Sequence, residues 1–186
     1  MKVLLRVLIP IFCLSLVFAG FANATIQDDV LLVPKTAEAP EVDGEMEEVW
    51  FGVTSTLMQV FTDDVPPDDW IDLFTTYKVM WDDEYFYFFG SVMDDELSTT
   101  SANSWENDSW EIYFDGENLK NEGSYIADND VQWRWVYDDA TAGVEGAEHA
   151  WMTTDYGFDF ELRIPVSAMP MTLEADHVFG WEAQVN

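Results

Sequence analysis

Short runs in which apolar and polar residues alternate are the feature that most constrains the fold. Successive side chains of an extended strand point to opposite faces, so the run at 109–115 places Trp110, Ile112 and Phe114 on one face. Similar runs occur at 75–81, 131–137, 157–165 and 179–186, and an aromatic run at 85–93 follows the first of these. Long helical periodicity is absent. The sequence therefore predicts an all-β fold, an antiparallel β-sandwich of the jelly-roll type with short helical turns.

The connections between these runs carry turn residues. An acidic turn at 82–84 separates two of the runs and predicts a β-hairpin. Upstream, Pro40 opens a segment that predicts one or two helical turns ending near Trp50. Pro165 closes another run and predicts a short helical turn at 166–169.

The first residues have the pattern of a secretory signal peptide. Lys2 and Arg6 supply positive charge, an apolar stretch follows, and Ala22, Asn23 and Ala24 form a small-residue cleavage site. We expect a signal peptide at 1–24, an N-terminal lead at 25–39 and one domain at 40–186. The mature protein is then secreted, periplasmic or held at the cell surface.

Composition excludes several functional classes. The single cysteine, Cys13, lies in the leader, so the mature domain is expected to lack disulfides and cysteine zinc sites. Aspartate and glutamate number 37 against 7 lysines and arginines, which gives a net charge of −30. So acidic a protein repels nucleic acids and anionic membrane surfaces, and we expect neither as a partner. Solubility or saline surroundings would account for most of this acidity.

The polar positions of the predicted strands carry directional hydrogen-bonding groups. Glu111, Gln132, Arg134 and Gln184 each lie within a run rather than at its end. On a concave sheet such groups could bind a hydroxyl-rich ligand. Alternatively, Arg134 pairs with Glu111 as a surface salt bridge that contributes about 0 to 1 kcal/mol. The residues alone leave both interpretations open.

A second candidate binding feature is Trp105, which lies in the polar loop 101–108. A large ring flanked by polar residues is expected to be partly exposed, and its face could stack on the C–H groups of a sugar ring. Single exposed tryptophans are also common on protein surfaces without a binding role.

The order of the segments resembles the family 9 carbohydrate-binding modules over residues 40–186. The segments are VDGEMEEVW, YKVMWDDEYFYFFGSVMD, SWENDSWEIYFD, VQWRWVY, FELRIPVSAM and FGWEAQVN. Members of that family are jelly-roll β-sandwich domains attached to secreted glycan-degrading enzymes. Any one segment is weak evidence for the resemblance, but six segments in this order are specific to the family and its relatives.

The resemblance assigns roles to individual residues. It implies that Trp105 stacks on a sugar ring and that Glu111, Arg134 and Gln184 hydrogen-bond the sugar, with Gln132 on the same strand as Arg134. The alternation independently places these polar residues on one side of their strands. Trp110 falls where the family has an aliphatic core residue, so we assign it to packing.

The implied function is that of a secreted, non-catalytic domain that binds neutral plant-type polysaccharides or oligosaccharides of the xylan or β-glucan class. It would act in polysaccharide breakdown with a hydrolase domain, either downstream or in trans. The family's second stacking aromatic lies beyond the segment that ends here at Asn186. We therefore expect the C-terminal strands of the domain to be missing from this sequence.

The resemblance also implies structural calcium. Hard cations prefer oxygen ligands, and loop aspartates offer them. The candidates are Asp82, Asp83, Asp94, Asp95, Asp128 and Asp130.

Three other functions stay open. A glycoside hydrolase would use Glu106 or Asp108 with Glu111 as its carboxylate pair. A haem-binding relative of the same sandwich would draw its axial ligands from His149, His177, Met58, Met80 and Met93. A structural or adhesion domain would have no sugar site.

Overall fold

The computed structural model describes residues 30–58, 67, 72–120, 124–141 and 143–186. The expected signal peptide at 1–24 lies outside the described residues, as do residues 25–29 of the lead at 25–39. Within the described ranges, no helix has both the length and the apolar character needed to cross a membrane.

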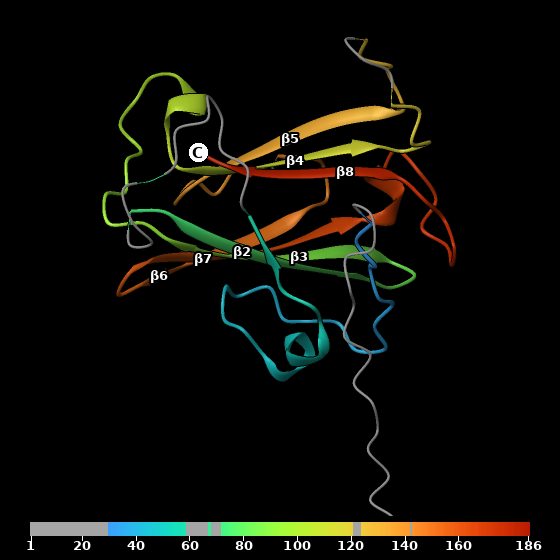
Figure 1. The fold of residues 1–186 in the computed structure, drawn as a ribbon, viewed down its shortest axis with the longest axis horizontal. Helices are drawn as coiled ribbons and strands as arrows, with labels where there is room; N and C mark the ends of the chain where they lie inside the picture. Colours follow the sequence, from blue (N-terminus) through green and yellow to red (C-terminus); the bar gives the residue numbers. More distant parts are fainter. Residues whose placement is uncertain (1–29, 59–66, 68–71, 121–123, 142) are drawn as a thin grey trace, which may run out of the picture.

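Two antiparallel sheets stack face to face, as predicted (Figure 1). The larger sheet has the order β1 (Thr56–Leu57), β2 (Phe74–Trp81), β3 (Tyr85–Met93), β7 (Gly157–Pro165) and β6 (Glu148–Thr154). The smaller sheet has the order β5 (Asp130–Val136), β4 (Ser109–Asp115) and β8 (Gly180–Val185). β2 and β3 form the predicted hairpin, in which Trp81 lies opposite Phe86.

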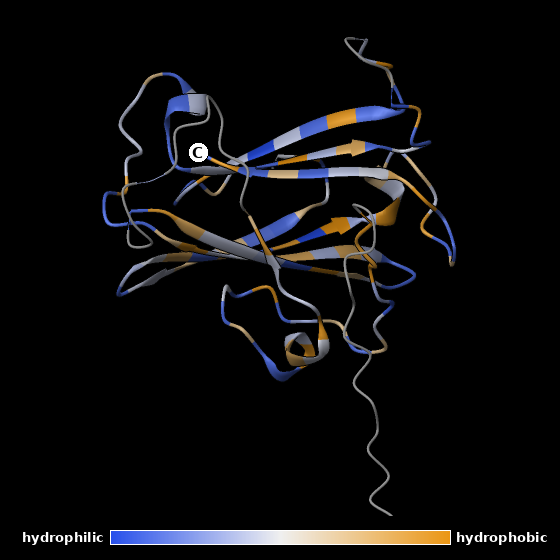
Figure 2. Cartoon of the chain, viewed as in Figure 1, coloured by the Kyte–Doolittle hydropathy of each residue, from blue (hydrophilic) through white to orange (hydrophobic). Residues whose placement is uncertain are grey.

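Apolar faces of both sheets form the main core between them, while hydrophilic residues occupy the loops and alternate positions along the strands (Figure 2). Trp110 is fully buried, as its place on the apolar face predicts, and its ring centroid lies 4.8 Å from that of Phe88. Gly90 makes room for this ring, since a Cβ atom there would lie 2.3 Å from Trp110. The alternating aromatics are therefore packing residues in most of the sandwich.

A second apolar cluster covers the outer face of the larger sheet. Residues 40–53, named here the N-terminal segment, cross this face beneath the sheet in Figure 1 and carry the short helix η1 (Glu48–Gly52). Trp50 of this helix packs with Met80, Tyr87 and Phe89. Strand β3 is thus buried on both faces, which explains why its sequence, YFYFFG, is aromatic without alternation.

The N-terminal segment is anchored by Glu161 of β7. The carboxylate accepts hydrogen bonds from Trp50 Nε1 at 2.8 Å and from the backbone N–H groups of Asp43 and Gly44, both at 3.2 Å. Gly44 has a φ of +85°, a left-handed conformation that favours glycine. Burial, opposed by these hydrogen bonds, raises the pKa of Glu161 to about 7.

The alternation did not reveal every element. β1 has two residues, and β6 is an edge strand with several exposed positions, so its sequence EHAWMTT shows no clear apolar face. Two further single-turn helices are η3 (Ser104–Glu106) and η4 (Val166–Ala168). η4 confirms the helical turn predicted after Pro165.

Candidate functional site

The polar side chains of the smaller sheet come together through strand register. Glu111 on β4 lies opposite Arg134 on β5 and Gln184 on β8, and Tyr113 lies two residues further along β4. These residues belong to what we call the polar face, which consists of Glu111, Tyr113, Gln132, Arg134, Glu182 and Gln184. The structure thus brings together the four polar residues predicted from the sequence.

Glu111 is the centre of a hydrogen-bond network on this face. Its Oε1 accepts from Arg134 Nε at 2.8 Å, from Arg134 Nη2 and from Asn186 Nδ2 at 2.9 Å. Its Oε2 accepts from Tyr113 Oη at 2.7 Å and from Gln132 Nε2 at 2.6 Å. A carboxylate offers about four acceptor positions, so all of them are in use. The network fixes the orientation of the surrounding donors.

Burial and hydrogen bonding act in opposite directions on Glu111. Burial favours its neutral form, but the hydrogen bonds from Tyr113, Arg134, Gln132 and Asn186 outweigh burial and lower its pKa. Glu111 is therefore a buried anion with its own counterion. The salt bridge considered from the sequence does exist, but it is not a surface pair, because the Glu111 side chain is only 4% exposed.

Tyr113 and Asn186 are members of the network that the sequence analysis missed. The alternation at 109–115 predicts Tyr113 on the side of its strand opposite Trp110 but assigns it no role. Its hydroxyl donates to Glu111 and accepts from Gln132 Nε2 at 3.0 Å. Burial, together with the hydrogen bond to Glu111, raises its pKa. The position of Tyr113 two residues after Glu111 was the available clue.

Trp105 lies on η3, next to the polar face. Arg134 Nη1 donates to Ser104 Oγ at 3.1 Å, which joins the helix directly to the face. The turn is braced by Asn107, whose side chain bonds the backbone of Ser101 at 2.9 and 3.1 Å. The Trp105 side chain stays 59% exposed. A solvent-exposed indole ring thus belongs to the residue that follows the Arg134 contact in the chain.

The carboxylates considered as a hydrolytic pair are engaged with their neighbours. Glu106 is fully exposed, and hydrogen bonds from Ser101 and Asn103 lower its pKa. Asp108 accepts from the backbone N–H of Ser98, and burial raises its pKa. Asp108 precedes β4 on the side of Trp110, whereas Glu111 projects from the opposite face. The geometry gives no support to a converging acid and base.

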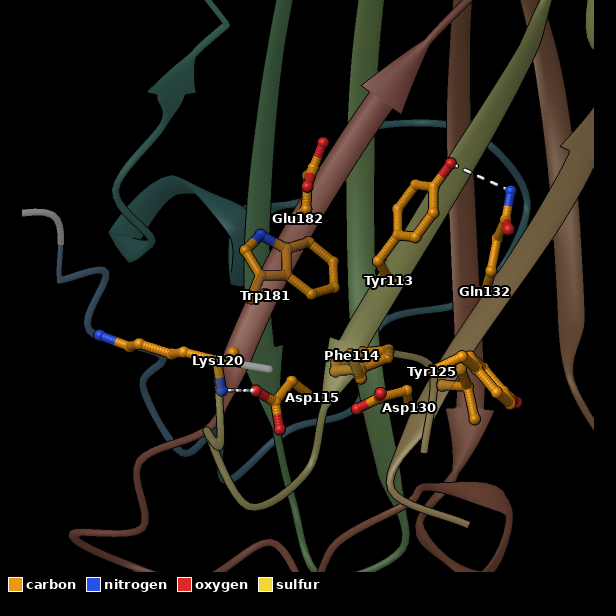
Figure 3. Close-up of a pocket in the computed structure, with 11 residues that line it drawn as sticks. Tyr113, Phe114, Asp115, Lys120, Tyr125, Asp130, Gln132, Trp181 and Glu182 are labelled. Atoms are coloured by element: carbon orange, nitrogen blue, oxygen red, sulfur yellow. Dashed lines mark hydrogen bonds between the residues drawn. The ribbon is translucent and has the colours of Figure 1, made fainter. Parts of the chain in front are cut away.

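A cavity of about 570 Å³ opens at the other end of the polar face (Figure 3). Tyr113, Gln132 and Glu182 form one side of it, so it is continuous with the polar face. Tyr125, in the loop before β5, forms another part of the wall and is 71% exposed. The sequence analysis did not anticipate this cavity.

The aspartates proposed as calcium ligands are dispersed. Within the described ranges, no group of three or more histidine, cysteine, aspartate or glutamate residues is placed to hold a metal ion. Asp82 accepts from the backbone N–H groups of Glu84 and Tyr85, and Asp83 pairs with Lys35. Asp94 and Asp130 also accept hydrogen bonds from backbone N–H groups. Asp128 lies in a turn with a φ of 70°, and Asp95 is exposed to solvent. The calcium assignment stays a prediction.

The residues considered for haem are dispersed in a similar way. His149 Nε2 lies 2.8 Å from the carbonyl oxygen of Asp139, and His177 Nε2 lies 3.0 Å from that of Gly116. Met80 is buried in the cluster under the N-terminal segment, Met58 is half-buried against the main core, and Met93 ends β3. Haem binding also stays untested.

Curated relatives match this chain over only a small part of their own length. Exoglucanase XynX of Acetivibrio thermocellus is 30% identical over 156 residues, which is 79% of this chain and 13% of the relative. Endo-1,4-beta-xylanase A of Thermotoga maritima is 32% identical over 154 residues, or 79% of this chain and 14% of the relative.

Solved structures with the same fold include a carbohydrate-binding module of family 9 from Caldicellulosiruptor kristjanssonii. Its complex with cellotriose has a TM-score of 0.67 at 24% identity and covers 83% of this chain and 75% of that chain. Its complex with glucose gives the same TM-score at 25% identity, over 83% and 76% of the two chains. Residues 42–186 match the family described as carbohydrate family 9 binding domain-like. The chain belongs to this family.

Proposed function

We propose that this protein is a non-catalytic domain that binds neutral carbohydrate, of the β-glucan or xylan class, on the polar face of its smaller sheet. Solved relatives hold cellotriose and glucose, and the curated relatives are named as an exoglucanase and a xylanase. Because this chain corresponds to about one seventh of those relatives, the partner we propose is a hydrolase domain, in the same polypeptide or in trans. Secretion fits such a role.

The observation that carries the proposal is that Trp105 is exposed on the short helix η3, which Arg134 contacts through Ser104. An exposed indole on the helix that contacts a fixed guanidinium offers both kinds of contact that a sugar needs, a flat apolar surface for its C–H groups and directional donors for its hydroxyls. Arg134 is held in place by Glu111 and Ser104 before a ligand arrives, which lowers the entropic cost of binding.

The polar face contains both buried and accessible groups, and the two kinds have different roles. Glu111 is almost fully buried and saturated with donors, so its main effect is to orient Arg134, Gln132 and Tyr113. Gln132 is exposed and Gln184 is half-exposed. Arg134, Gln132 and Gln184 therefore supply the hydroxyl contacts, while a direct contact of Glu111 with sugar stays a prediction.

Trp105→Ala tests the proposal. Calorimetric titration with glucose, cellotriose and xylotriose should show binding by the wild type, and the variant should bind roughly ten-fold more weakly or worse. The melting temperature should change little, because most of the ring is exposed. Phe51→Ala is the matched control, since Phe51 is 67% exposed in η1 on the outer side of the other sheet.

Other outcomes would favour the other functions. Equal binding by the wild type and Trp105→Ala would exclude the stacking site. Release of reducing sugar from xylan or β-glucan would indicate a hydrolase, and a Soret absorption band would indicate haem. Failure of the wild type to bind any glycan would support a structural or adhesion role.

A further inference from the structure

We propose that the cavity beside Tyr125 is a second sugar subsite, so that a single oligosaccharide spans the polar face from Trp105 to this cavity. The inference rests on the proposed function and extends it to ligand length. Two observations carry it: the cavity is open to the polar face, and an exposed aromatic ring forms part of its wall.

The distance between Trp105 and the cavity is too long for one sugar unit and requires an oligosaccharide. Both places can be located along β4. Glu111 lies opposite Arg134, which contacts the Trp105 helix, and Asp115 lines the cavity. Four residues of strand correspond to about 13 Å at the usual rise per residue. A monosaccharide on Trp105 would therefore not reach Tyr125.

The chemistry of the cavity fits a neutral, hydroxyl-rich ligand. Figure 3 shows the rings of Tyr113 and Tyr125 and the amide of Gln132 around it, while the Lys120 ammonium group points away. Its carboxylates, those of Asp115, Asp130 and Glu182, accept from hydroxyl groups and repel anions.

Two of the acceptors on the cavity wall are fixed in orientation. Asp115 accepts from the backbone N–H groups of Leu119 and Lys120 at 3.0 and 2.8 Å, and Asn129 Nδ2 donates to it at 2.9 Å. Asp130 accepts from the Ile126 N–H at 2.7 Å and also from Asn129. Preorganised acceptors next to an aromatic ring are what a sugar subsite needs.

Tyr125→Ala tests the subsite against ligand length. Calorimetric titrations would use glucose, cellotriose and cellohexaose as probes. We expect the variant to bind glucose like the wild type and to bind cellohexaose roughly three- to ten-fold more weakly, the factor expected for a lost ring contact. Tyr125→Phe keeps the ring and should retain the wild-type affinity for cellohexaose.

The controls separate this inference from the proposed function. Trp105→Ala should weaken binding of both glucose and cellohexaose, and Tyr156→Ala, which removes another exposed tyrosine, should weaken neither. Unchanged cellohexaose affinity in Tyr125→Ala, with a clear loss in Trp105→Ala, would overturn the subsite and leave the proposed function intact. Unchanged affinity in Trp105→Ala would exclude the stacking site, and failure of the wild type to bind any of the three probes would overturn the proposed function itself.

Discussion

Replacing Arg134 by methionine should destabilise the domain in a way that depends on pH. Methionine keeps much of the apolar stem of arginine but removes the charge and the N–H donors. Glu111 would lose the donors Nε and Nη2 and keep those of Tyr113, Gln132 and Asn186. The substitution thus leaves an almost fully buried carboxylate without its counterion.

The magnitude follows from how deeply the pair is buried. Removing one partner of a buried ion pair costs about 3 to 5 kcal/mol. The Arg134 side chain is 24% exposed, so water partly replaces it, and we expect a loss of about 2 to 3 kcal/mol at neutral pH. For a domain of this size that loss lowers the melting temperature by about 4 to 12 °C.

The sign of the pH effect follows from the pKa of Glu111. In the wild type this pKa is lowered, so Glu111 contributes stability above its unfolded-state pKa and loses that contribution as the pH falls through the folded-state value. Without Arg134, burial is opposed by fewer hydrogen bonds and the pKa rises. The variant's Glu111 then takes up a proton on mild acidification, which relieves the penalty. The stability difference should shrink from about pH 7 towards about pH 4.

Urea unfolding followed by tryptophan fluorescence, at several pH values, measures this difference. Lys35→Met is the control, because its pair with Asp83 is exposed and should contribute no more than about 1 kcal/mol. The double variant Glu111→Gln/Arg134→Met should recover part of the stability lost in the single variant. A loss below about 1 kcal/mol, or one independent of pH, would show that Glu111 is well solvated and that the polar face is not preorganised by it.

Two further predictions concern proton and metal binding. The pKa of Glu161 is raised to about 7, above its unfolded-state value, so its effect on stability becomes less favourable as the pH rises from about 4.5 to 7. Glu161→Gln should remove this slope from the urea stability profile, and an unchanged slope would contradict the assignment. If calcium is structural, EDTA should lower the melting temperature and added calcium should restore it. An EDTA-independent melting temperature would exclude the calcium proposal.

Sequence alternation predicted the strand faces because the smaller sheet is apolar on one side only. Trp110, Ile112 and Phe114 could be separated from Glu111 and Tyr113 by parity alone. β3 could not be assigned faces in this way, because the N-terminal segment covers its second face. β6 was missed because an edge strand does not need a continuous apolar face.

The candidate site was predictable in its members but not in its organisation. Parity placed Glu111, Arg134 and Gln184 on one side of their strands, and register brought them together. The saturation of Glu111 depends on donors from β4, from β5 and from Asn186, and the cavity depends on where the Tyr125 loop lies. Both are tertiary features with no local pattern in the sequence.

The anchoring of the N-terminal segment has a consequence for the order of folding. Trp50 and its acceptor Glu161 are 111 positions apart in the sequence. The chain is synthesised from its N-terminus, so the segment made first has no docking place until β7 has formed. Closing so long a loop carries a large entropic cost, which is recovered only when the sheet is complete. The outer face of the larger sheet should therefore be the last surface of the domain to lose its water.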